Sequence, residues 1–64
     1  MNKTIKLVKR VPSLYTDIMT IVIEFENDIG LIKKYNGHDN LIESKKVKSE
    51  EALVWVTHPN FKIQ

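Results

Sequence analysis

One nine-residue stretch, IMTIVIEFE at positions 18–26, most constrains what this chain can fold into. Its β-branched and aromatic side chains favour extended backbone, in which alternate residues point to opposite faces. The residues that share one face of this predicted strand are Met19, Ile21, Ile23 and Phe25. Ile18 and Val22 make part of the opposite face apolar as well. We therefore expect a mostly β fold in which at least one face of this strand is buried.

Three further segments are predicted to be strands of the same sheet. The first, 4–11, alternates Ile5 and Leu7 with polar or charged neighbours and ends at a Val-Pro step, because proline cannot donate to a strand ladder. The other two are expected at 30–35 and 41–48, and the last of these would be mostly exposed. The order of the segments predicts a meander of neighbouring strands.

Two groups of turn residues are expected to join the later strands. Asn27, Asp28 and Gly30 follow the strongest strand, and asparagine and glycine tolerate a positive φ. Asn36 and Gly37 form the Asn-Gly pair that favours a type I′ turn. Both connections are therefore predicted to be tight hairpins.

The C-terminal part of the chain allows two interpretations. Ser49 followed by Glu50 and Glu51 is typical of a helix start, where acidic side chains complement the helix dipole. The run ALVWVT at 52–57 is instead rich in strand formers, and Pro59 would stop a helix after two turns. We favour a strand at 52–57 and keep a short helix as the alternative.

These elements predict a mostly β fold, a small antiparallel meander of four to five strands that is either an open sheet or an SH3-like open barrel. The alternative is an α+β fold with one short helix on the sheet. The chain has 64 residues, no internal repeat and no linker, so we expect one small domain over 1–64. It has no cysteine, and its stability must therefore come from packing or association.

Little in the sequence indicates an enzyme. His38, His58 and Asp39 are the only candidate metal-binding or catalytic group, and two histidines twenty positions apart do not match the ligand spacing of a zinc site. Gly30 and Gly37 are the only glycines, which is too few for a phosphate-binding loop. We expect a non-enzymatic protein without a metal or other cofactor.

The setting of the protein is suggested by its composition. No apolar stretch approaches the ~18 residues of a membrane span, and no signal peptide is evident, so a cytoplasmic protein is expected. Lysine, isoleucine and asparagine are abundant while alanine and arginine occur once each, as in proteins from AT-rich genomes. This usage suggests a low-GC microbe or a phage or prophage accessory protein.

A surface for association is expected because a sheet this small can cover only one of its faces. In the predicted strand 52–57, Leu53 and Trp55 lie opposite Ala52 and Val54, so both faces are apolar. The predicted protein interface consists of the apolar anchors Trp55, Leu53 and Tyr15 and the charged rim Lys33, Lys34 and Lys46. We therefore expect a protein-binding module. Its partner is either another protein or a second copy of the same chain, which would make it a homo-oligomer. Masking or inhibition of a host protein is its most concrete form.

Nucleic-acid binding is the competing hypothesis. Lysines near an aromatic residue can hold phosphates and stack bases. The candidate residues are Lys33, Lys34, Tyr35, Lys45, Lys46 and Lys48. Because the formal net charge is only +2, the protein-binding hypothesis is preferred. Glu24 and Glu26 are expected to pair with Lys6 and Arg10 of the first strand.

Overall fold

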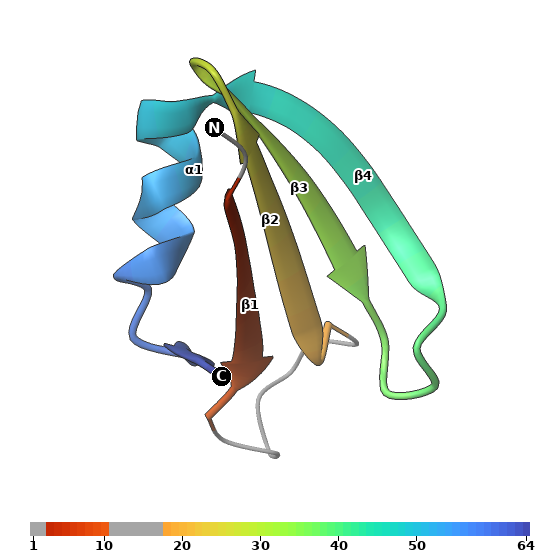
Figure 1. Ribbon diagram of the computed structural model, residues 1–64. Coiled ribbons are helices and arrows are strands. Elements are labelled where there is room, and N and C mark those ends of the chain that lie inside the picture. The colour runs from red at the N-terminus through yellow and green to blue at the C-terminus, as the bar shows by residue number, and fades with distance from the viewer. Residues whose placement is uncertain (1–2, 11–17) are drawn as a thin grey trace.

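The computed structural model describes residues 3–10 and 18–64, which form a five-stranded antiparallel sheet and one helix (Figure 1). The elements are β1 (Lys3–Lys9), β2 (Thr20–Glu26), β3 (Ile29–Tyr35), β4 (Leu41–Lys48), α1 (Ser49–Val56) and β5 (Phe61–Ile63). The order of strands across the sheet is β4-β3-β2-β1-β5. The mostly β class and the four predicted strands are therefore confirmed within the described residues.

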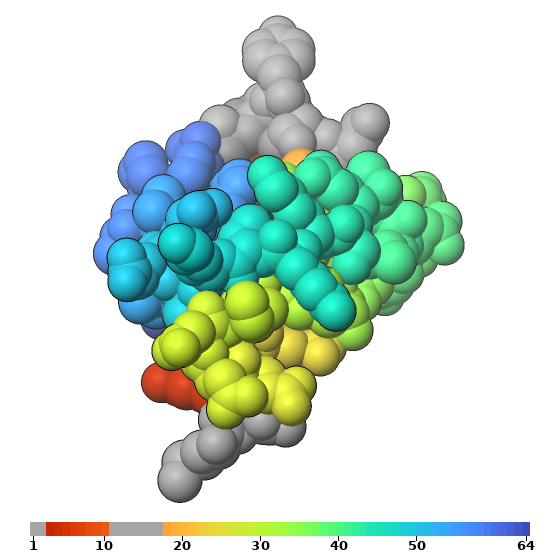
Figure 2. All heavy atoms as spheres, turned by 90° about the horizontal axis from the view of Figure 1, so that it is seen from above, coloured from red at the N-terminus to blue at the C-terminus, as the bar shows by residue number. Residues whose placement is uncertain are grey.

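The sheet does not close into a barrel, so the expectation of an SH3-like barrel is wrong and the α+β alternative is correct. β4 and β5 lie at the two edges of the sheet and do not pair with each other. α1 lies along one face of the sheet, and its chain continues into β5 beside β1 (Figure 1). Figure 2 shows the side chains of β4 at the molecular surface beside the helix.

The hairpin between β2 and β3 has the short turn that the sequence predicts. Glu26 pairs with Ile29, which leaves Asn27 and Asp28 as the turn. Asn27 has a φ of 56°, a conformation that asparagine tolerates better than most residues. Gly30 was predicted both as a turn residue and as the start of the strand at 30–35; it lies in β3, as the strand prediction has it, and has no positive φ.

The loop between β3 and β4 differs from the predicted type I′ turn at the Asn-Gly pair. Gly37 has no positive φ, whereas Asp39 has a φ of 60°. The side-chain Oδ1 of Asn36 accepts hydrogen bonds from the backbone N–H groups of His38 (2.9 Å) and Asn40 (3.0 Å). The asparagine side chain thus organises a longer loop by bonding main-chain donors that a two-residue turn would not contain.

The segment predicted as a strand at 52–57 is part of helix α1, and tertiary contacts account for the difference. The Ser49 N–H donates to the carbonyl oxygen of Asp28 at 2.8 Å, which ties the start of the helix to the β2–β3 turn. Helical spacing then places Ala52, Trp55 and Val56 against the sheet, whereas a strand would have placed Ala52 with Val54. Burial on a preformed sheet outweighs the strand propensity of these residues.

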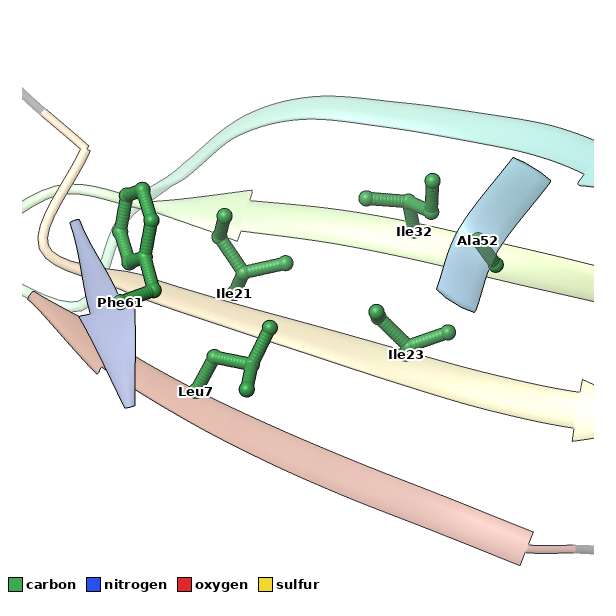
Figure 3. Close-up of a cluster of buried hydrophobic side chains, with 6 residues drawn as sticks. All are labelled: Leu7, Ile21, Ile23, Ile32, Ala52 and Phe61. Carbon is green, nitrogen blue, oxygen red and sulfur yellow. The ribbon is translucent and has the colours of Figure 1, made fainter. Parts of the chain in front are cut away.

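The buried core lies between the sheet and α1 (Figure 3). Its members are Leu7, Ile21, Ile23, Ile32, Ala52 and Phe61. A Cβ atom built at Gly30 would lie only 2.6 Å from the Cβ atom of Ala52. Gly30 therefore allows the helix to approach the sheet closely. The sequence had suggested a turn as the reason for a glycine at this position.

Candidate protein-binding surface

Trp55 packs within the layer between helix and sheet, where residues of its own chain partly bury it. Its ring stacks on that of His58, with a centroid distance of 5.3 Å and an interplanar angle of 16°. The Phe61 ring meets it edge-on at 6.0 Å, and the Lys34 Nζ lies 4.7 Å from its centroid. Trp55 is therefore already in contact with three side chains of its own chain.

The structure does not bring the predicted interface anchors together. Leu53 lies on the outward side of α1 with 49% of its surface exposed, on a different side of the helix from Trp55. Tyr15 lies outside the described residues. The helical spacing separates Leu53 from Trp55 because residues two apart in a helix do not share a face.

The predicted lysines divide between the two faces of the sheet. Lys33 lies opposite Val22 on the face away from the helix, and Lys46 lies on that same face. Lys34 lies on the helix side, where its Nζ is 3.5 Å from the Glu43 carboxylate. The interface rim predicted from the sequence is therefore distributed over both faces.

The predicted nucleic-acid set is divided in the same way. Lys33, Tyr35, Lys46 and Lys48 share the face away from the helix. Lys34 and Lys45 lie on the helix side. The sequence prediction grouped them because they are close in the chain, but the alternation of strand residues separates neighbours.

We call the face of the sheet away from α1 the open face. It carries the even-numbered residues of β1, β2 and β5, the odd-numbered residues of β3, and Leu41, Ser44, Lys46 and Lys48 of β4. No described element packs on this face, because α1 lies on the other one.

Four aliphatic side chains form a diagonal band across the open face, and the Glu24–Lys33 pair flanks it. Val8, Val22 and Leu31 are half-buried, and Ile29 is 45% exposed. A shallow cavity of about 500 Å³ lies over this surface. Its lining comprises Thr4, Glu24, Glu26, Ile29, Leu31 and Lys46, together with Lys3, Phe25 and Asn27. Thr4, Glu24, Leu31 and Lys46 form one row across four strands.

Charged side chains flank this aliphatic band. The lysines of the open face are Lys6, Lys33, Lys46, Lys48 and Lys62, and its acids are Glu24 and Glu26. Five lysines and two glutamates leave a net charge of +3 on this face. A surface of this sign attracts acidic partners.

Glu24 forms an ion pair with Lys33, with 2.7 Å between the carboxylate Oε1 and the Nζ. The hydrogen bond from Lys33 to this carboxylate, followed by the charge of Glu24, raises the pKa of Lys33 above its ordinary value. The expected pairing of Glu24 with β1 is thus replaced by a pairing with β3. Arg10, the other expected partner on the first strand, donates from its Nε to the carbonyl oxygen of Phe61 at 3.2 Å.

Four residues of the open face were not predicted to be interface residues: Lys6, Lys62, Val22 and Leu31. Val22 and Lys6 alternate with core residues on their strands. This alternation could have predicted that both lie on the face opposite the core. The position of Lys62 depends on β5 pairing with β1, which a three-residue strand cannot indicate by itself.

The two histidines lie in different parts of the structure. His38 is exposed in the loop between β3 and β4, whereas the His58 Nδ1 accepts a hydrogen bond from the Asn60 N–H at 3.1 Å. In the described ranges, no group of three or more His, Cys, Asp or Glu residues could hold a metal ion. None of the helices in residues 3–10 and 18–64 has the length and apolar character needed to cross a membrane.

Comparison with known proteins yields no matching family model, no matching curated protein and no matching solved structure.

Proposed function

We propose that this chain is a non-enzymatic protein-binding module that docks an acidic protein surface on its open face. The observation that carries the proposal is a diagonal aliphatic band that no described element covers, formed by Val8, Val22, Ile29 and Leu31 and flanked by lysines and by Glu24 and Glu26. Apolar surface of this kind gains free energy when a partner removes it from water, and the lysines steer the approach of a negatively charged partner.

The cavity above Leu31 supports an apolar side chain as the central contact of the partner. Its volume of about 500 Å³ exceeds that of a single side chain, and Glu24 and Glu26 are among the residues that line it. A partner residue that enters this cavity would be surrounded by polar groups that can bond to its main chain. This arrangement of an apolar band and a polar rim is typical of protein interfaces.

Nucleic acid fits this face less well. Glu24 and Glu26 would lie close to bound phosphates, and the ion pair with Glu24 already engages Lys33. Of the described aromatic residues, only Tyr35 belongs to the open face, whereas sheets that bind single strands use several stacking platforms. Nucleic-acid binding is the second candidate function, because the open face carries five lysines and Tyr35. The experiment below distinguishes the two functions.

The biological form that we propose is a phage or prophage accessory protein that masks or inhibits a host protein. Lysine-rich, alanine-poor composition supports an AT-rich genome as the source. A small sheet with a surface helix offers a rigid face that can cover a site on a larger protein. Its mechanism would be steric occlusion combined with charge attraction.

The test is capture of a host protein by the immobilised chain, with two leucine substitutions as a matched pair. Leu31→Asp places a charge in the aliphatic band of the open face, whereas Leu53→Asp places the same charge on the outward side of α1. We expect the Leu53 variant to retain its partner and the Leu31 variant to lose it, at least tenfold in Kd. Circular dichroism establishes that both variants are folded.

Equal retention by both variants would contradict the open face as the docking site. Binding of labelled single-stranded RNA or duplex DNA is measured in parallel at low and high salt. Binding that weakens steeply with salt and is lost in Lys6→Glu would instead favour the nucleic-acid candidate.

A further inference from the structure

β4 is an open edge of the sheet over its whole length. It has eight residues, of which all but Val47 are exposed, and among the described strands it pairs only with β3. The opposite edge, β5, has only three residues. Long edge strands offer unpaired main-chain groups to another strand, and β4 is therefore the element of this fold best suited to add one.

Every second residue of β4 directs its main-chain groups away from β3. The Ser49 N–H donates to the Asp28 carbonyl oxygen in the β3–β4 ladder, and the Lys9 N–H donates to the Met19 carbonyl oxygen in the β1–β2 ladder. From the alternation of an antiparallel ladder, it follows that the even-numbered residues of β3 form their main-chain hydrogen bonds with β4. The odd-numbered residues of β3 form theirs with β2. In the regular part of the ladder, Ser44 and Lys46 consequently present their N–H and C=O groups to solvent.

We infer that a second copy of this chain pairs with β4 in antiparallel orientation, with the twofold axis passing through Ser44. Two five-stranded sheets would then join into one continuous sheet. The Ser44 residues of the two copies exchange main-chain hydrogen bonds at the axis, because both direct these groups outward. This inference is independent of the open face.

The charges of β4 select this register over its neighbours. A twofold axis perpendicular to the sheet brings helix-side residues opposite helix-side residues. With the axis at Ser44, Glu43 of each copy lies opposite Lys45 of the other, at a non-hydrogen-bonded position where side chains are closest. An axis at Lys45, Lys46 or Glu43 would instead place identical charges opposite each other.

The helix side of β4 has room for this partner. α1 leaves a cleft of about 150 Å³ beside the strand, lined by Glu43, Lys45, Val47, Glu51 and Trp55 with Ile32 and Lys34. The twofold axis brings the clefts of the two copies onto the same face. Leu41 and Ile42, 54% and 47% exposed, lie at the start of β4 beyond its irregularity and would approach the end of β4 of the second copy. Association thus covers apolar surface that one copy leaves exposed.

Sedimentation equilibrium over a concentration series tests the inference. We expect a reversible dimer that Ser44→Pro abolishes, since proline removes the outward N–H while the bonds to β3 remain. Ser44→Ala keeps this N–H and is expected to dimerise like the wild type. Trp55 emission reports whether each variant retains its fold, because the ring packs between helix and sheet.

A charge exchange tests the register. Glu43→Lys alone brings lysines opposite Lys45 and should weaken dimerisation by about tenfold or more, because like charges across an interface repel. Adding Lys45→Glu to that variant restores opposite charges in the dimer, and we expect the affinity to return to within about threefold of the wild type. A wild-type chain that stays monomeric, a dimer that survives Ser44→Pro, or a double variant as weak as the single one would each overturn the inference.

Discussion

Gly30 and Ala52 show how a single missing side chain positions the helix. The Cβ atom that alanine would add at position 30 lies 2.6 Å from the Cβ atom of Ala52, and both atoms are attached directly to backbone. Neither can move without shifting the helix or the strand. The contact therefore determines how closely α1 can approach the sheet.

Gly30→Ala is expected to lower the free energy of unfolding by about 1–3 kcal/mol, the range for overpacking a close-packed contact. Glycine is otherwise unfavourable in a strand, so the opposite sign would be expected if the helix were not there. Chemical denaturation measures the difference. Gly37→Ala is the control, because its added Cβ would make an ordinary 3.5 Å contact with the Met19 Cγ, and a loss as large as that at Gly30 would contradict the argument.

Asn27 adopts a backbone conformation that most residues avoid. Asn27→Ala should reduce stability by about 1 kcal/mol, whereas Asn27→Gly should cost nothing or increase it slightly, because glycine adopts a positive φ without strain. Thermal unfolding compares the two variants. Asp28→Ala, at the neighbouring turn position without a positive φ, should stay within about 0.5 kcal/mol of the wild type. Equal effects of alanine and glycine at Asn27 would show that the φ is not the cause.

At the scale of the element, α1 is the part of the fold for which sequence and structure disagree. Its residues have strand propensity, yet the helix presents Ala52, Trp55 and Val56 to the sheet. The acidic residues Glu50 and Glu51 in its first turn and Pro59 after its end agree with the helix. The helical alternative was based on these same features. They are not sufficient by themselves, because a helix this short is stable only when it packs against the sheet.

A pair of glutamate substitutions distinguishes helix from strand. A strand would place Ala52 and Val54 on one face, whereas the helix buries Ala52 and leaves Val54 63% exposed. We expect Val54→Glu to change the free energy of unfolding by less than about 0.5 kcal/mol, since it is a surface substitution. Ala52→Glu should prevent folding, because it buries a charge without a partner. Circular dichroism melting is the measurement, and comparable damage from both variants would indicate a strand.

At the scale of the whole molecule, the fold depends on a small core and one covered face of the sheet. Within residues 3–10 and 18–64, six residues form the buried cluster, and the chain has no cysteine that could form a disulfide to assist them. A small domain of this kind has a stability of only ~5 kcal/mol. Single core truncations are therefore comparable with the total stability.

Ile23→Ala is expected to cost about 2–5 kcal/mol and to leave much of the chain unfolded at room temperature. Val22→Ala, at the preceding residue, removes fewer atoms, and these atoms lie on the open face. It should therefore lower the free energy of unfolding by less than about 1 kcal/mol. Urea denaturation followed by Trp55 emission compares them. If the two costs were equal, the open face would be as buried as the core.

The sequence alone determined the class of the fold, the positions of four strands and the tight β2–β3 turn. These depend on local properties: alternation over seven or eight residues, and turn residues such as Asn27 at a position that needs a positive φ. The tertiary structure decided that 49–56 is a helix, that the sheet stays open, and that Lys33 and Lys34 serve different faces. Each of these outcomes depends on contacts between distant residues, such as Gly30 with Ala52 and Ser49 with Asp28, which outweigh local propensity by burial and hydrogen bonding.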